Sequence, residues 1–162
     1  MKTIERTEYL NRIKNLKDTP DIKVITGIRR SGKSILMQEY IQYLKDNFND
    51  INVIFIDFMD LSFEHLKEYH ALHAYVEKQY VEGKSNYLFI DEVQMCPNFE
   101  LAVNSLYSKR KYDIYITGSN AFLLSADLAT LFTGRYIEIH VYPFSFKEYC
   151  NYYDNNHDIE KL

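Results

Sequence analysis

The sequence predicts an α/β domain with a mostly parallel sheet that has helices on both faces. Five short runs rich in β-branched and aromatic residues alternate with segments in which apolar residues recur at helical spacing. In such an alternation each helix returns the chain to the start of the next parallel strand by a right-handed crossover. The chain has 162 residues, which suffices for one compact domain but not for two ordinary ones.

The expected strands are residues 22–26, 53–57, 87–91, 114–117 and 137–141. The second and third are almost wholly apolar, which is typical of strands that helices cover on both faces. The fifth alternates polar and apolar residues, so we expect it near an edge of the sheet.

The expected helices are residues 5–16, 33–48, 63 to about 82, 99–109 and 121–131. The first is amphipathic, since Tyr9, Ile13 and Leu16 recur at helical spacing between charged residues. We expect residues 1–150 to form the core domain. Residues 151–162 are rich in Asn and Asp with little to bury, and should form a poorly ordered tail.

The composition excludes several classes of protein. With 19 Lys+Arg against 23 Asp+Glu, the net charge of −4 provides no overall positive excess to bind a nucleic acid backbone. Two cysteines, Cys96 and Cys150, favour free thiols in a reducing compartment, with a single disulfide as the alternative. Because no apolar stretch has the length of a signal peptide or membrane span, we expect a cytoplasmic protein without membrane contact.

Residues 27–34, here called the phosphate loop, read GIRRSGKS and match the pattern G-x-x-x-x-G-K-[ST]. The loop follows a predicted strand and opens a predicted helix, the context in which backbone N–H groups and the helix dipole bind a triphosphate. Lys33 is expected to neutralise the β- and γ-phosphates of ATP, and the Ser34 hydroxyl to bind Mg²⁺. Arg29 and Arg30 are available to nucleotide, a neighbouring subunit or an acidic partner. The expected nucleotide-binding residues are Gly27, Arg29, Arg30, Ser31, Gly32, Lys33 and Ser34.

Two carboxylates, Asp91 and Glu92, end the third predicted strand. Ligands of parallel sheets bind beyond the carboxyl ends of the strands, so both should share an edge with the phosphate loop. We expect Asp91 to hold Mg²⁺ through a water molecule. Glu92 is expected to polarise the water that attacks the γ-phosphate.

The fourth strand ends in small polar residues at the same edge. Thr117, Ser119 and Asn120 are all candidates for sensing the γ-phosphate, and Asn120 is the one we place in the catalytic set. The alternative is that residues 118–120 form only a turn and a helix cap.

Arg135 precedes the fifth strand, and arginine suits bidentate contact with a phosphate. We expect it to act in trans, on the nucleotide of a neighbouring subunit in a homo-oligomer, the alternative being a surface arginine at a helix end. The turn Lys109-Arg110-Lys111 is short and basic, and we expect it to be exposed to solvent and not to bind nucleic acid. The histidines of residues 65–73 lack the H-E-x-x-H pattern of a metal site.

Four motifs, taken in order, resemble the successive signatures of a group of prokaryotic AAA-type ATPases. They are ITGIRRSGKS at 25–34, FIDEVQ at 89–94, ITGSN at 116–120, and LFTGR at 131–135 leading into VYPFSFKEY at 141–149. The resemblance implies a three-layer P-loop NTPase fold with a five-stranded sheet of order 5-1-4-3-2, and ATP with Mg²⁺ as ligands. It further implies Lys33 and Ser34 on phosphate and metal, Asp91 on metal, and Glu92 as the catalytic carboxylate.

In that group the core is followed by a C-terminal module, so we expect this chain to be the N-terminal ATPase core alone, either a fragment of a longer protein or a natural truncation. We expect the C-terminal module to bind DNA or protein. The leading hypothesis is ATP hydrolysis that drives an attached or partner module. One alternative is a nucleotide-gated binding module with little turnover. Another is a small-molecule P-loop kinase, which the absence of arginine from residues 119–133 disfavours.

Overall fold

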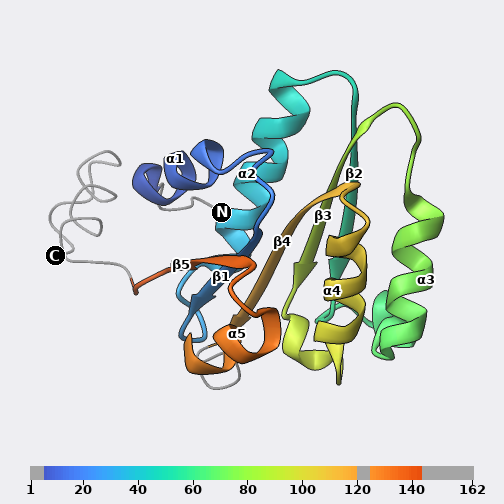
Figure 1. Cartoon of the computed structure of the whole chain (residues 1–162). Coiled ribbons are helices and arrows are strands. Elements are labelled where there is room, and N and C mark those ends of the chain that lie inside the picture. The colour runs from blue at the N-terminus through green and yellow to red at the C-terminus, as the bar shows by residue number, and fades with distance from the viewer. Residues whose placement is uncertain (1–5, 120–124, 144–162) are drawn as a thin grey trace, which may run out of the picture.

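The computed structural model describes residues 6–119 and 125–143, and these form a five-stranded sheet between two layers of helix (Figure 1). All neighbouring strands pair in parallel, in the order β2-β3-β4-β1-β5. The strands are β1 (Ile22–Gly27), β2 (Ile51–Asp57), β3 (Ser85–Asp91), β4 (Tyr112–Ser119) and β5 (Tyr136–His140). The predicted fold and strand order are confirmed, and β5 lies at an edge as expected.

The helices divide between the two faces of the sheet (Figure 1). On one face lie α1 (Thr7–Asn15) and α2 (Lys33–Asn47), and on the other lie α3 (Tyr69–Gln79), α4 (Phe99–Ser108) and α5 (Ser125–Phe132). No helix among the described residues is both long and apolar enough to cross a membrane.

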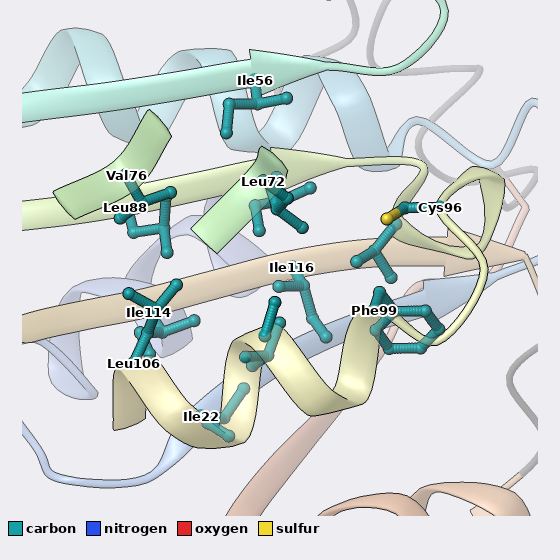
Figure 2. Close-up of a cluster of buried hydrophobic side chains, with 14 of the residues drawn as sticks. Ile22, Ile56, Leu72, Val76, Leu88, Cys96, Phe99, Leu106, Ile114 and Ile116 are labelled. Atoms are coloured by element: carbon teal, nitrogen blue, oxygen red, sulfur yellow. The ribbon is translucent and has the colours of Figure 1, made fainter. Parts of the chain in front are cut away.

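Two hydrophobic cores account for the continuous apolar strands. Leu88 belongs to the core under α3, α4 and α5, whereas Phe89, the next residue of β3, belongs to the core under α1 and α2. Successive side chains of a strand point to opposite faces, so a strand covered on both faces needs apolar residues throughout. Figure 2 shows the first core, in which Leu72 of α3 and Leu106 of α4 lie against β3 and β4. Cys96 is a free thiol buried in this core.

The predicted helix over residues 63–82 is wrong in its first part. The structure has a 3-10 helix, η1 (Leu61–Leu66), and a separate α3 that begins at Tyr69. The Glu68 carboxylate accepts hydrogen bonds from the backbone N–H groups of His70 and Ala71, at 2.9 and 2.8 Å. This side-chain cap, with Glu68 itself in an extended conformation, starts a new helix where apolar periodicity alone predicts a continuous one.

A buried ion pair lies near the amino ends of β1 and β4. The Lys23 Nζ is 2.6 Å from Asp113 Oδ1, and both side chains are almost fully buried. Asp113 Oδ2 also accepts hydrogen bonds from the Asp18 backbone N–H and the Tyr115 hydroxyl, both at 2.8 Å. The pair ties the loop before β1 to the sheet at the end opposite the phosphate loop.

Candidate functional site

The register of the sheet places the phosphate loop beside the ends of β3 and β4. Gly27, the last residue of β1, pairs with Ser119 of β4, and Ile25 pairs with Thr117. One strand further, Ile90 pairs with Ile116 of β4, so Asp91 and Thr117 occupy the next level. Residues 27, 91 and 119, distant in sequence, thus meet at the carboxyl edge of the sheet.

The phosphate loop has two positions that only glycine fits well. A Cβ atom at Gly27 would lie 2.4 Å from the Val141 carbonyl oxygen and 2.6 Å from Ser31 Oγ. Gly32 is the N-cap of α2 with φ of 96°, a left-handed conformation that glycine adopts without steric cost. Since glycine has no side chain to cap the helix, the first N–H groups of α2 remain available to an anion.

Lys33 lies at the base of this loop and is buried. Its ammonium group donates hydrogen bonds to the carbonyl oxygens of Gly27 and Ile28, at 3.0 and 2.9 Å. Burial lowers the pKa of Lys33 below its usual 10.5, while the negative charges of Glu92 and Asp91 act in the opposite direction. The ammonium group therefore lies within the electrostatic field of both carboxylates.

The other loop residues differ in exposure. Arg29, Arg30 and Ser34 are exposed, whereas Ser31 is fully buried. The Ser31 Oγ has no hydrogen-bond partner among the described residues. Arg30 adopts a positive φ of 67°, so the loop reverses direction at this exposed residue.

The Thr117 hydroxyl joins the two carboxylate residues that follow β3. It donates a hydrogen bond to Asp91 Oδ1 and accepts one from the backbone N–H of Glu92 at 2.9 Å. Asp91 and Thr117 are both buried. A side chain of β4 thus fixes the positions of Asp91 and the Glu92 backbone.

Glu92 lies in the left-handed region, with φ of 56°. This conformation costs a non-glycine residue roughly 1–2 kcal/mol and is concentrated at functional sites. The Gln94 side-chain amide donates a hydrogen bond to Glu92 Oε2, which holds the carboxylate in place. The sequence analysis predicts no role for Gln94. The only signal for one is its position two residues after Glu92.

Arg135 is not brought to the site of its own chain. Its carbonyl oxygen accepts a hydrogen bond from Ile22 N–H at the start of β1, 2.9 Å away, whereas the phosphate loop follows the end of that strand. Its guanidinium lies 5.7 Å from the centre of the Tyr107 ring. Tyr107 lines a cleft of about 310 Å³ at the amino edge of the sheet.

The remaining predicted residues fall into two groups. Asn120 lies outside the described residues, and so does Cys150. In the basic turn, Lys109 pairs with Glu77 at 2.7 Å and Lys111 lies over the Tyr80 ring. His73 Nε2 is 2.9 Å from Ser105 Oγ, which gives this imidazole a partner from α4.

The parallel sheet, the glycine-bounded loop between β1 and α2, and the carboxylates after β3 together define a P-loop NTPase domain. The comparisons with known proteins then give the family. The family model described as "AAA domain" matches residues 19–150, and the chain belongs to this family. Family and fold together support nucleotide binding and hydrolysis as its general function.

The sequences of two relatives align with most of this chain. An uncharacterized protein of Haemophilus influenzae is 40% identical over 150 residues, which is 91% of this chain and 38% of that protein. The uncharacterized protein MJ1544 of Methanocaldococcus jannaschii is 30% identical over 154 residues, covering 94% of this chain and 33% of its own. The chain thus spans about a third of the length of these relatives.

Solved structures share the fold at low sequence identity. AMPPCP-bound DnaA from Aquifex aeolicus is 17% identical with a TM-score of 0.60, covering 100% of this chain and 52% of DnaA. A DNA polymerase III gamma subunit-related protein of Thermotoga maritima is 14% identical with a TM-score of 0.61, covering 94% of this chain and 54% of its own. At these identities the likeness concerns the fold alone.

Proposed function

We propose that this domain binds ATP with Mg²⁺ and hydrolyses it to ADP and phosphate. The observation that carries the proposal is the position of Lys33. Its buried ammonium lies at the base of the phosphate loop, next to the N-terminus of α2, which has no side-chain cap. The negative charges of Glu92 and Asp91 favour its protonated form. One edge of the sheet therefore combines a positive charge that can bind phosphate with two carboxylates, one for the metal and one for the attacking water.

The donor set fits Mg²⁺. This cation prefers hard oxygen ligands and binds through few protein groups, because it retains water and phosphate oxygens. The Ser34 hydroxyl and the Asp91 carboxylate would hold it, and the bound cation would neutralise charge on the phosphates. Thr117 would orient Asp91 through its hydrogen bond to Oδ1.

Glu92 is the proposed general base. As the oxygen of water forms its bond to the γ-phosphorus, the carboxylate accepts the proton of that water and ADP departs. Two contacts support this role, the Thr117 hydroxyl on the Glu92 backbone and the Gln94 amide on its carboxylate. Asn120 stays our proposal for the residue that senses the γ-phosphate.

Arg135 is proposed to act on the nucleotide of a neighbouring subunit. Its exposed side chain and its place at the amino edge, away from the phosphate loop of its own chain, support a role between subunits. Hydrolysis would then require assembly of a homo-oligomer. We further propose that the cycle drives an attached or partner module that binds DNA or protein, since the relatives are about three times as long as this chain.

A nucleotide titration tests the binding step. Calorimetry with Mg²⁺ and a non-hydrolysable ATP analogue should give saturable binding to the wild-type chain and none to Lys33→Ala. Lys45→Ala changes an exposed lysine of the last turn of the same helix and should bind like wild type. Equal binding by Lys33→Ala and Lys45→Ala would overturn the proposal.

A further inference from the structure

Arg6 is a buried arginine that contacts the phosphate loop from outside the nucleotide motif. Only 8% of its surface is exposed. Its Nη1 donates a hydrogen bond to the Ser31 carbonyl oxygen at 2.9 Å, and its Nη2 donates to the Pro143 carbonyl oxygen at 3.5 Å. One guanidinium group thus bridges the loop and the chain that follows β5.

The aromatic ring of Tyr9 completes this arrangement. The Arg6 guanidinium lies 4.6 Å from the centre of the Tyr9 ring, a cation–π distance. The Tyr9 hydroxyl accepts a hydrogen bond from the Tyr142 backbone N–H at 3.1 Å. Arg6 and Tyr9 therefore both form hydrogen bonds to residues 142–143, and Arg6 also forms one to Ser31.

The loop and the chain after β5 are also in direct contact. The Val141 backbone N–H donates at 2.7 Å to the carbonyl oxygen of Thr26, the β1 residue that immediately precedes the loop. The space beside Gly27 is filled by the Val141 carbonyl oxygen, which is where a Cβ atom would lie. The position of Val141 therefore limits the room available to the start of the phosphate loop.

The hydrogen bond from Arg6 fixes a peptide group that matters for anion binding. Ser31 immediately precedes Gly32, the N-cap of α2, and its own N–H donates to the Ile28 carbonyl oxygen at 3.1 Å. The peptide that joins Ser31 to Gly32 has its carbonyl oxygen on Arg6, so its N–H points away from the guanidinium. A fixed peptide here presents a pre-oriented donor, which binds an anion at lower entropic cost than a mobile one.

We propose that Arg6 is a positioning residue that holds the phosphate loop in its nucleotide-binding conformation and couples it to residues 141–143. The proposal rests on the proposed function of the loop, ATP binding. Arg6 acts through the Ser31 carbonyl and not by contact with phosphate. A change in the path of the chain after β5 would reach the loop through this guanidinium.

Hydrogen exchange combined with nucleotide titration tests the proposal on the 162-residue chain. In Arg6→Ala, the amides of Ser31 and Val141 should exchange at least about tenfold faster, and the Kd for a Mg²⁺-ATP analogue should rise about tenfold or more. Amides at the centre of β3 should keep their wild-type rates. Arg6→Lys keeps the positive charge and one donor nitrogen but lacks the planar fork, so it should recover part of the affinity and protection.

Arg12→Ala is the matched control. Arg12 lies in α1, the helix that Arg6 precedes as its N-cap. Its exposed side chain donates to a backbone carbonyl of β5, that of Glu138 at 3.0 Å, in place of one in the loop. This variant should keep wild-type exchange and affinity. Unchanged exchange and affinity in Arg6→Ala would overturn the proposal, as would equal effects in Arg12→Ala. So would faster exchange throughout β3, which would make Arg6 a purely structural residue.

The exchange measurement separates this proposal from the function of the loop. It requires no nucleotide, because the contacts of Arg6 are made within the chain. Absence of ATP binding in the wild-type chain would count against the proposed function alone. If Arg6→Ala does not fold, the comparison of Arg6→Lys with wild type decides between faster loop exchange, which the proposal requires, and unchanged exchange, which overturns it.

Discussion

Thr117 on β4 forms a hydrogen bond with Asp91 on β3 through its buried hydroxyl. The same oxygen accepts the backbone N–H of Glu92 at 2.9 Å. A single hydroxyl thus links two neighbouring strands where their ends face the phosphate loop. Its loss would leave the buried Asp91 carboxylate without one of its donors, and the partly buried Glu92 N–H without its acceptor.

Replacement of Thr117 by valine should therefore impair the site more than the fold. Valine keeps the branched shape of the side chain and removes only the hydroxyl, so the two unpaired groups should cost about 1–3 kcal/mol of unfolding free energy. ATP hydrolysis should fall about tenfold or more, because Asp91 and Glu92 lose their shared support. Urea unfolding and a phosphate-release assay measure the two effects. Thr117→Ser keeps the hydroxyl and should retain most of the activity, whereas wild-type turnover in Thr117→Val would refute the supporting role.

The affinity for ATP should decrease at alkaline pH. Burial lowers the pKa of Lys33 below 10.5, so its ammonium loses a proton at a pH where an exposed lysine remains charged. Between the lowered pKa and 10.5, Lys33 is protonated in the unfolded chain but not in the folded chain, so its contribution to the free energy of unfolding rises with pH. Over the same range the folded chain loses the positive charge that binds phosphate, so the affinity for ATP falls. A series of Kd measurements from about pH 7 to pH 10 tests this. A constant Kd over the series would contradict the role of Lys33.

The buried pair of Lys23 and Asp113 provides a test away from the site. Lys23→Met leaves the Asp113 carboxylate without its cation, and removal of one partner of a buried pair typically costs about 3–5 kcal/mol. Urea unfolding should show this loss, and the double variant Lys23→Met with Asp113→Asn should recover much of it. Additive losses in the double variant would show that the pair is not coupled.

The sequence predicts the elements of this fold well because three of its strands, β1, β3 and β4, are buried on both faces. Continuous apolar runs such as those around Leu88 and Phe89 have few other interpretations in an alternating α/β pattern. Apolar periodicity does not predict the start of α3, because that start depends on hydrogen bonds from the His70 and Ala71 backbone N–H groups to the Glu68 side chain.

The candidate site was predicted only as far as its motifs extend. The phosphate loop and the Asp91-Glu92 pair follow from local patterns. The contact from Arg6 to Pro143 joins residues 137 positions apart, and the bond from Thr117 to Asp91 depends on strand order. Such contacts arise from tertiary packing, which a single sequence does not display.

Assembly is tested by mixing two inactive variants. Lys33→Ala removes the nucleotide site of a subunit, and Arg135→Ala removes the proposed contribution to its neighbour. If Arg135 acts in trans, each variant alone should be nearly inactive, and an equimolar mixture should regain part of the wild-type hydrolysis rate. A mixture no more active than the two variants separately would exclude the trans role.

Hydrolysis itself is tested most directly by Mg²⁺-dependent ATP turnover in Glu92→Gln beside wild type, with analogue binding measured on the same samples. The substitution keeps the shape of the side chain and removes the base, so binding should persist while turnover falls about 10²–10⁴-fold. Glu100→Gln, in the first turn of α4, should behave like wild type. Wild-type turnover in Glu92→Gln would contradict the assignment of the base, and tight binding without turnover in the wild-type chain would favour a nucleotide-gated binding module.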